Sequence, residues 1–178
     1  MNSLERIIYE YKDLISNPDP NCGMVVSLEN ENDYRLWKVS LFGPKDTSYR
    51  EGLFFMNVKF PDEYPLKPPE VCFLTPVYHL NINDRAPKSP NDIPLGKVSI
   101  STLNWWKSEY SMRELLIKIF VLFYNGNPDN CFDLDKAEEF CENRAVYEEK
   151  IKHFTKKYAN PSKPQIKYDI NKDCDFEL

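Results

Sequence analysis

The chain has 178 residues, of which 42% are apolar and 14% aromatic, enough to fill one sizeable hydrophobic core. Its formal net charge is −5 and no basic cluster appears, which argues against nucleic acid as a partner because phosphate binding needs such a surface. Charges run throughout residues 1–14, so we expect neither a signal peptide nor a membrane span there. The expected location is cytoplasmic, nuclear or both, with no membrane partner.

Apolar residues recur at helical spacing over residues 3–16, which predicts an amphipathic helix that Ser3 can cap. The Asn-Pro-Asp-Pro segment at residues 17–20 ends this helix. Alternating apolar residues and short polar turns then predict an antiparallel meander of strands. The four expected strands cover residues 24–28, 36–42, 53–60 and 71–74.

Four prolines surround Lys67 between the third and fourth strands, at positions 61, 65, 68 and 69. Each proline fixes φ and removes a backbone donor, so we expect a rigid, extended loop there. The simplest interpretation of this loop is a structural turn.

The second half of the chain is predicted to be helical. Ser111 and Glu114 form a capping-box pattern that opens the most hydrophobic helix, which Gly126 and the following Asn-Pro-Asp end. Two further helices are expected at residues 133–142 and 144–158. The polar, aperiodic residues 160–178 indicate a tail rather than a second domain. We therefore expect an α+β fold in a single domain over residues 1–159.

Five cysteines form no C-x-x-C pair and no Cys/His cluster of zinc spacing, so we expect no metal site. An odd number of cysteines without an export signal indicates reduced thiols. These residues are Cys22, Cys72, Cys131, Cys141 and Cys174.

The polar and aromatic residues of greatest interest lie between the sheet and the later helices, at positions 78–106. This stretch holds His79, Asn81, a polar excursion with prolines, a short apolar run around Ser99, and two tryptophans. Its motifs have a fixed order with their flanks: Y-P-x-K-P-P, an apolar strand, H-x-N, G-x-[VI]-x-[IL], W, a helix and N-P-D. In this order the chain resembles the core of the ubiquitin-conjugating enzymes, from about residue 4 to residue 159.

The resemblance implies transfer of ubiquitin or a ubiquitin-like protein. Family members accept the modifier from an activating enzyme as a thioester and pass it to a lysine, directly or with a RING-type or other ligase. ATP is used by the activating enzyme, and this chain shows no phosphate-binding loop, so we expect no cofactor of its own. The family's catalytic cysteine lies in a G-x-I-C-L context, and the matching position here is Ser99.

The resemblance also assigns roles around Ser99. Asn81 matches the asparagine that donates to the oxyanion and orders a loop over the site, and His79 matches a structural histidine. Leu80 replaces the family's proline, which frees φ and restores a backbone donor. Asn130 and Asp129 match the gate that receives the lysine, although an amide cannot take a proton as a carboxylate does.

Serine at position 99 has two competing explanations. A hydroxyl is a far poorer nucleophile than a thiolate at neutral pH, and no base is evident beside it in the sequence. Either the active parent has cysteine and the serine blocks turnover or traps an oxyester, or the chain is a natural non-catalytic variant that binds ubiquitin or serves as a scaffold. The preserved GKVSISTL context and N-P-D gate favour the active parent.

A third hypothesis, a serine hydrolase that uses Ser99 and His79, conflicts with the motifs. The sequence has no G-x-S-x-G elbow, and residues 98–100 form an apolar, extended pattern.

Partner contacts are implied at three places. Leu66 matches an exposed hydrophobic residue that contacts RING-type ligases, and Arg6 matches a basic position on the first helix that meets the activating enzyme. That helical face is equally well explained as a solvated surface. Ser108 and Glu109 follow the second tryptophan where many members have Ser-Pro-Ala, which suggests a restricted choice of ligases. An insertion at residues 83–94 either overhangs the site and selects partners, or is a solvated loop.

Overall fold

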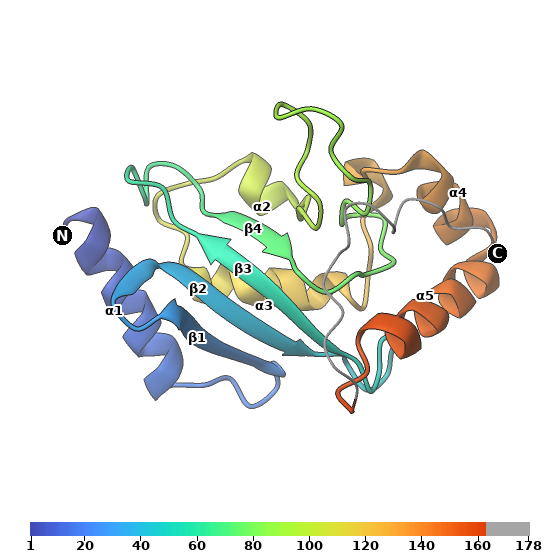
Figure 1. Ribbon diagram of the computed structural model, residues 1–178, viewed down its shortest axis with the longest axis horizontal. Coiled ribbons are helices and arrows are strands. Elements are labelled where there is room, and N and C mark those ends of the chain that lie inside the picture. The colour runs from blue at the N-terminus through green and yellow to red at the C-terminus, as the bar shows by residue number, and fades with distance from the viewer. Residues whose placement is uncertain (163–178) are drawn as a thin grey trace.

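The computed structural model describes residues 1–162, so residues 163–178 of the expected tail, with Cys174, lie outside the described part. Ten elements follow one another along the described chain (Figure 1). They are α1 (Ser3–Ser16), β1 (Met24–Asn30), β2 (Asp33–Phe42), β3 (Leu53–Lys59), β4 (Glu70–Phe73), α2 (Ser101–Asn104), α3 (Met112–Leu122), the 3-10 turn η1 (Pro128–Asn130), α4 (Leu134–Glu142) and α5 (Arg144–Tyr158).

The four strands form one antiparallel sheet in the order β1-β2-β3-β4, which confirms the predicted α+β meander. Val39 in β2 pairs with Val26 on one side and Met56 on the other, and all three side chains are buried. The buried side of α3 joins this core, with α1 at one end of the sheet and α5 at the other (Figure 1). Alternation in the strands therefore supplies one apolar face for the helices to cover.

The first helix has the predicted bounds, but the predicted cap is wrong. Asn2, not Ser3, is the N-cap: its side chain accepts from the Glu5 N–H at 2.9 Å, and the Glu5 carboxylate accepts from the Asn2 N–H at 2.9 Å. Asn and Ser are equally good caps, so adjacent candidates cannot be ranked by residue type. The Ser111–Glu114 capping box of α3 is confirmed.

A buried carboxylate on α1 joins three parts of the fold. Glu10 accepts hydrogen bonds from the Tyr64 hydroxyl, at 2.8 Å, and from the backbone N–H of Met112 at the start of α3. It also pairs with Arg6 one turn earlier on the same helix. Because a buried charge is stable only when it is paired and hydrogen-bonded, Glu10 fixes α1 against α3 and the proline-rich loop.

The proline-rich loop, residues 61–69, is not the extended segment that the prolines predict. It is a succession of turns in which the N–H groups of Leu66 and Lys67 both donate to the Glu63 carbonyl, at 2.7 and 3.2 Å. The residues between the prolines keep their backbone donors, and these donors close the turns. Leu66 projects from the loop with 79% of its surface exposed.

The insertion, residues 83–94, is anchored at its base and exposed at its tip, where it rises between α2 and α4 (Figure 1). The Asn83 amide nitrogen donates to the carbonyls of Arg85, Ile93 and Pro94, each at 3.1 Å. Asp84 forms an ion pair with Lys136 of α4, and both side chains are nearly buried, with 11% and 7% exposed. Arg85 pairs with Asp133 at 2.9 Å, with the arginine 67% exposed and the aspartate 13% exposed.

We predict that Lys136→Met lowers the free energy of unfolding by about 3–5 kcal/mol, since it leaves the Asp84 carboxylate buried without a counter-charge. The matched control is Arg85→Met, which breaks the neighbouring pair by removing its exposed partner. Asp133 keeps the backbone N–H groups of Asp135 and Lys136 as donors, so this variant should cost less than about 1 kcal/mol. Urea unfolding of both variants measures the difference. Equal losses would show that the Asp84–Lys136 pair does not anchor the insertion.

Candidate functional site

Ser99 lies half-buried on a short extended segment just before α2. Its neighbours Val98 and Ile100 are buried in the core, and Val98 forms an isolated antiparallel bridge with Ile82. Successive side chains of an extended chain point to opposite sides, so the Ser99 side chain points away from the core. The Ser99 backbone N–H donates to the Asn81 carbonyl at 2.8 Å, while its hydroxyl makes no hydrogen bond to any residue in 1–162.

Asn81 is fully buried, and its side chain holds the segment after α3. The amide nitrogen donates to the carbonyls of Asn127 and Asn130, both at 2.8 Å, and the amide oxygen accepts from the Asn127 N–H at 2.8 Å. Both amide hydrogens are therefore used within the fold. This geometry suits loop ordering, whereas donation to an oxyanion would require one of these bonds to break.

His79 is buried with both ring nitrogens engaged. Nε2 donates to the Leu122 carbonyl at 2.9 Å, and Nδ1 accepts from the Asn81 N–H at 2.9 Å, so the neutral Nε2–H tautomer fits the site. Burial lowers the pKa of His79 to about 4, although the Leu122 carbonyl partly opposes this shift. With neither nitrogen free, the imidazole has no lone pair to offer a nucleophile at Ser99.

Leu80 uses the backbone donor that a proline would lack. Its N–H donates to the Tyr147 hydroxyl of α5 at 3.0 Å, and its carbonyl accepts from the Phe132 N–H at 2.9 Å. The side chain is buried against Gly126, where an added Cβ would lie 2.3 Å from Leu80 Cδ2. The loop at residues 79–81 is thus held by Tyr147 of α5, a residue that no sequence motif indicated.

The gate residues have different surroundings. Asp129 is exposed, and its N–H donates to the Asn127 side chain at 3.0 Å, which caps η1. Asn130 is half-buried, and its side-chain oxygen accepts from the Asn104 amide at 2.9 Å. The sequence motifs did not point to Asn104. The N-P-D motif did contain a signal for Asn127, since Asn before Pro commonly caps a helical turn.

The expected partner residues differ in their exposure. Arg6 is paired with Glu10 and donates to the Tyr110 carbonyl at 3.3 Å, so its charge is largely satisfied within the chain. Leu66 and Trp105 are each 79% exposed, and the Trp106 indole N–H donates to the Pro65 carbonyl at 2.7 Å, which ties their two loops together. Ser108 is half-buried and Glu109 is exposed on the loop after Trp106.

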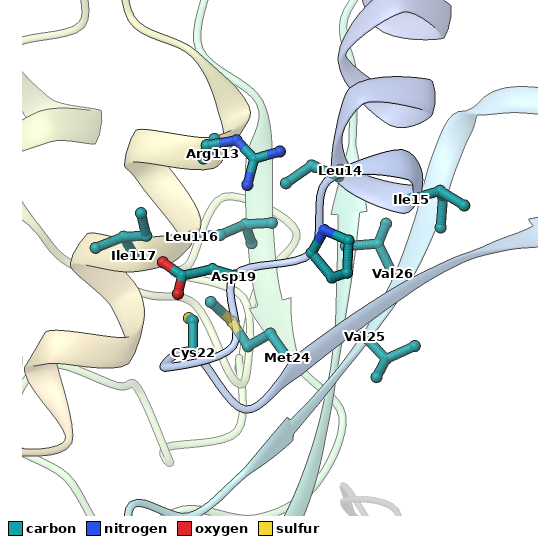
Figure 2. Close-up of a pocket in the computed structure, with 11 residues that line it drawn as sticks. Leu14, Ile15, Asp19, Cys22, Met24, Val25, Val26, Arg113, Leu116 and Ile117 are labelled. Atoms are coloured by element: carbon teal, nitrogen blue, oxygen red, sulfur yellow. The ribbon is translucent and has the colours of Figure 1, made fainter.

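A pocket of about 140 Å³ lies elsewhere, between the end of α1, the start of β1 and α3 (Figure 2). Most of its lining is apolar, with Arg113 and Asp19 as the charged exceptions. None of the residues that the sequence assigned to the site lines it. No group of His, Cys, Asp or Glu side chains in residues 1–162 is arranged to hold a metal ion, and no helix in that range could cross a membrane.

The lowered pKa of His79 predicts a pH dependence of stability. The unfolded chain binds a proton on this histidine near its usual pKa of about 6.5, while the folded chain stays neutral until about pH 4. Stability that is present above pH 6.5 is therefore lost as the pH falls toward 4, by about 3 kcal/mol for a shift of this size. Urea unfolding between about pH 7 and pH 4.5 measures the slope.

The slope should be shallower in His79→Gln and unchanged in His153→Gln, the matched control at the exposed histidine. If His79→Gln is too unstable to measure, the imidazole signals of the unsubstituted chain can be followed by NMR. Protonation of His79 near its ordinary pKa of about 6.5 in the folded chain would contradict the effect of burial.

Proteins of known family are similar in sequence to this chain over nearly its whole described length. A family model described as ubiquitin-conjugating enzyme matches residues 6–155. The chain is 34% identical over 156 residues to ubiquitin-conjugating enzyme E2 13 of Schizosaccharomyces pombe, covering 87% of this chain and 97% of that protein. It is 31% identical over 158 residues to probable ubiquitin-conjugating enzyme E2 31 of Arabidopsis thaliana, covering 88% and 93%. The chain belongs to the ubiquitin-conjugating enzyme family.

Proposed function

We propose that residue 99 is the position at which this chain carries the C-terminus of ubiquitin or a ubiquitin-like protein. The observation that supports this most is the half-exposed Ser99, whose backbone is bonded to the same asparagine that holds the gate segment. Family membership supports conjugation as the process in which the chain takes part. ATP would be consumed by the activating enzyme, so the chain itself needs no cofactor.

The chemistry at residue 99 depends on its heteroatom. In the proposed reaction the acyl group passes from the activating enzyme to residue 99 and then to a lysine amine. A thiolate is nucleophilic near neutral pH and its thioester stays reactive toward amines, whereas a serine hydroxyl needs a base. His79 cannot serve as that base because both of its nitrogens are engaged. The chain with Ser99 should therefore form at most a slow oxyester.

A non-catalytic role is the second candidate. It is favoured by one specific observation, the absence of any hydrogen-bonding side chain at the Ser99 hydroxyl within residues 1–162. In that role the same fold would bind the modifier or its enzymes as a scaffold. The two candidates share every partner surface and differ only in turnover.

Two exposed side chains suggest where a ligase would bind. Leu66 and Trp105 lie on loops joined by the Trp106–Pro65 hydrogen bond, so their apolar surfaces are presented on a rigid base. A RING-type ligase would contact this pair, with Ser108 and Glu109 at the margin. Because Arg6 is already paired, we expect its contribution to recognition of the activating enzyme to be small.

The deciding experiment incubates Ser99→Cys with activating enzyme, ATP and ubiquitin, and looks for an adduct that reductant removes. The cysteine variant should load rapidly, while the serine chain should load slower by roughly 10²–10⁴-fold, the usual value of a missing general base. Any adduct of the serine chain should resist reductant and disappear in Ser99→Ala.

The modifier must be varied among ubiquitin and ubiquitin-like proteins before a negative result is accepted, with circular dichroism confirming that each variant is folded. Absence of any adduct on a folded Ser99→Cys chain would overturn the carrier role and leave the scaffold role.

A further inference from the structure

Residue 99 belongs to a closed circuit made of three hydrogen bonds and the chain that runs from Ser99 through α2 to Asn104. On one side, the Ser99 N–H donates to the Asn81 carbonyl, and the Asn81 amide donates to the Asn130 carbonyl at 2.8 Å. On the other side, α2 leads from Ser99 to Asn104, whose amide donates to the Asn130 side-chain oxygen at 2.9 Å. Asn130 therefore joins the segments that precede and follow residue 99.

The circuit fixes which end of the Asn130 amide is available. Its oxygen is occupied by Asn104, and its nitrogen donates no hydrogen bond within residues 1–162. The Asn81 amide, by contrast, has both hydrogens committed to backbone carbonyls. Asn104 also keeps one N–H that is uncommitted within the described chain, but its other N–H is spent on holding Asn130. Of the two, Asn130 is the one whose backbone carbonyl is bonded to Asn81, the residue that also accepts from the Ser99 N–H.

We propose that Asn130 supplies the donor that stabilises the oxyanion formed at residue 99, and that Asn104 is the positioning residue that aims this donor. These roles rest on the proposed carrier function. They change Asn130 from an acceptor for the incoming lysine to a donor for the carbonyl oxygen, and they leave Asn81 with the task of ordering the loop.

In the Ser99→Cys variant the proposed step is aminolysis of a thioester. The lysine nitrogen bonds to the carbonyl carbon, and the carbonyl oxygen takes the displaced electron pair and accepts from the Asn130 N–H. As the carbonyl re-forms, the carbon–sulfur bond breaks and its electron pair leaves with the sulfur, which becomes the thiolate of the Ser99→Cys variant. The excess proton on the amine passes to water.

The test exploits the difference between an amide and a carboxylate at position 104. Asn104→Asp removes the N–H that Asn130 accepts, and the new carboxylate can only accept, so the Asn130 amide should turn and present its oxygen to residue 99. In the Ser99→Cys background, discharge of a preformed thioester to free lysine should slow by roughly 10²-fold, as when one oxyanion donor is lost. The KM for lysine should stay unchanged, because the donor acts in the transition state.

Two companion variants separate this role from a structural one. Asn130→Asp keeps the acceptor for Asn104 but has no N–H, so it should also slow discharge, whereas an acceptor role for Asn130 predicts acceleration. Asn104→Asp should have no further effect in the Asn130→Ala background, because the two residues act as one unit. Acceleration by Asn130→Asp, or an effect of Asn104→Asp that persists without Asn130, would overturn the inference.

A second measurement does not depend on loading. In the unsubstituted Ser99 background, Asn104→Asp should shift the NMR signals of the Asn130 side-chain NH₂ and slow its hydrogen exchange, since that group gains an acceptor. Unchanged Asn130 signals would refute the positioning by Asn104. If Ser99→Cys fails to load at all, the carrier function fails; if it loads but discharge is insensitive to Asn104→Asp, only the donor role of Asn130 fails.

Discussion

The hydrogen bonds of one buried side-chain amide hold the candidate site together. Asn81 makes three side-chain bonds of 2.8 Å to the backbone of residues 127 and 130, and its carbonyl receives the N–H of Ser99. An unsatisfied buried donor or acceptor costs about 1–3 kcal/mol, so a half-made version of this arrangement would be unstable. The position of residue 99 and that of the gate are consequently set by the same side chain.

Other contacts keep Asn81 in place from three directions. His79 accepts the Asn81 N–H and donates to the Leu122 carbonyl at the end of α3, which links the motif to the most hydrophobic helix. The Leu80 N–H donates to the Tyr147 hydroxyl of α5, so the backbone at position 80 is held in place although it lacks a proline ring. The insertion is tied down beyond the motif by the Asp84–Lys136 pair. These contacts account for an ordered site even though Leu80 replaces the family's proline and an insertion follows the motif.

Sequence periodicity predicted nearly all of the larger elements, because an amphipathic helix or a half-buried strand carries its own repeat. The shorter pieces escaped prediction: α2 has four residues, too few to show a period, and the proline-rich loop closes its turns through the donors of the residues between the prolines. The motifs H-x-N and N-P-D indicated the candidate site. Its bonds could not be predicted in the same way, since Asn104 and Asn130 are 26 positions apart and Leu80 and Tyr147 are 67 apart. Such pairs are decided by tertiary packing, which single-residue preferences do not describe.

The ordering role of Asn81 is tested most directly by amide hydrogen exchange at Asn127, whose N–H donates to the Asn81 side chain although the residue is exposed. We expect slow exchange of this amide in the unsubstituted chain and exchange at least about tenfold faster in Asn81→Ala, while the amide of Val39 in β2 stays protected in both. Rapid exchange at Asn127 in the unsubstituted chain, or a rate unaffected by Asn81→Ala, would contradict the claim that this side-chain amide orders the site.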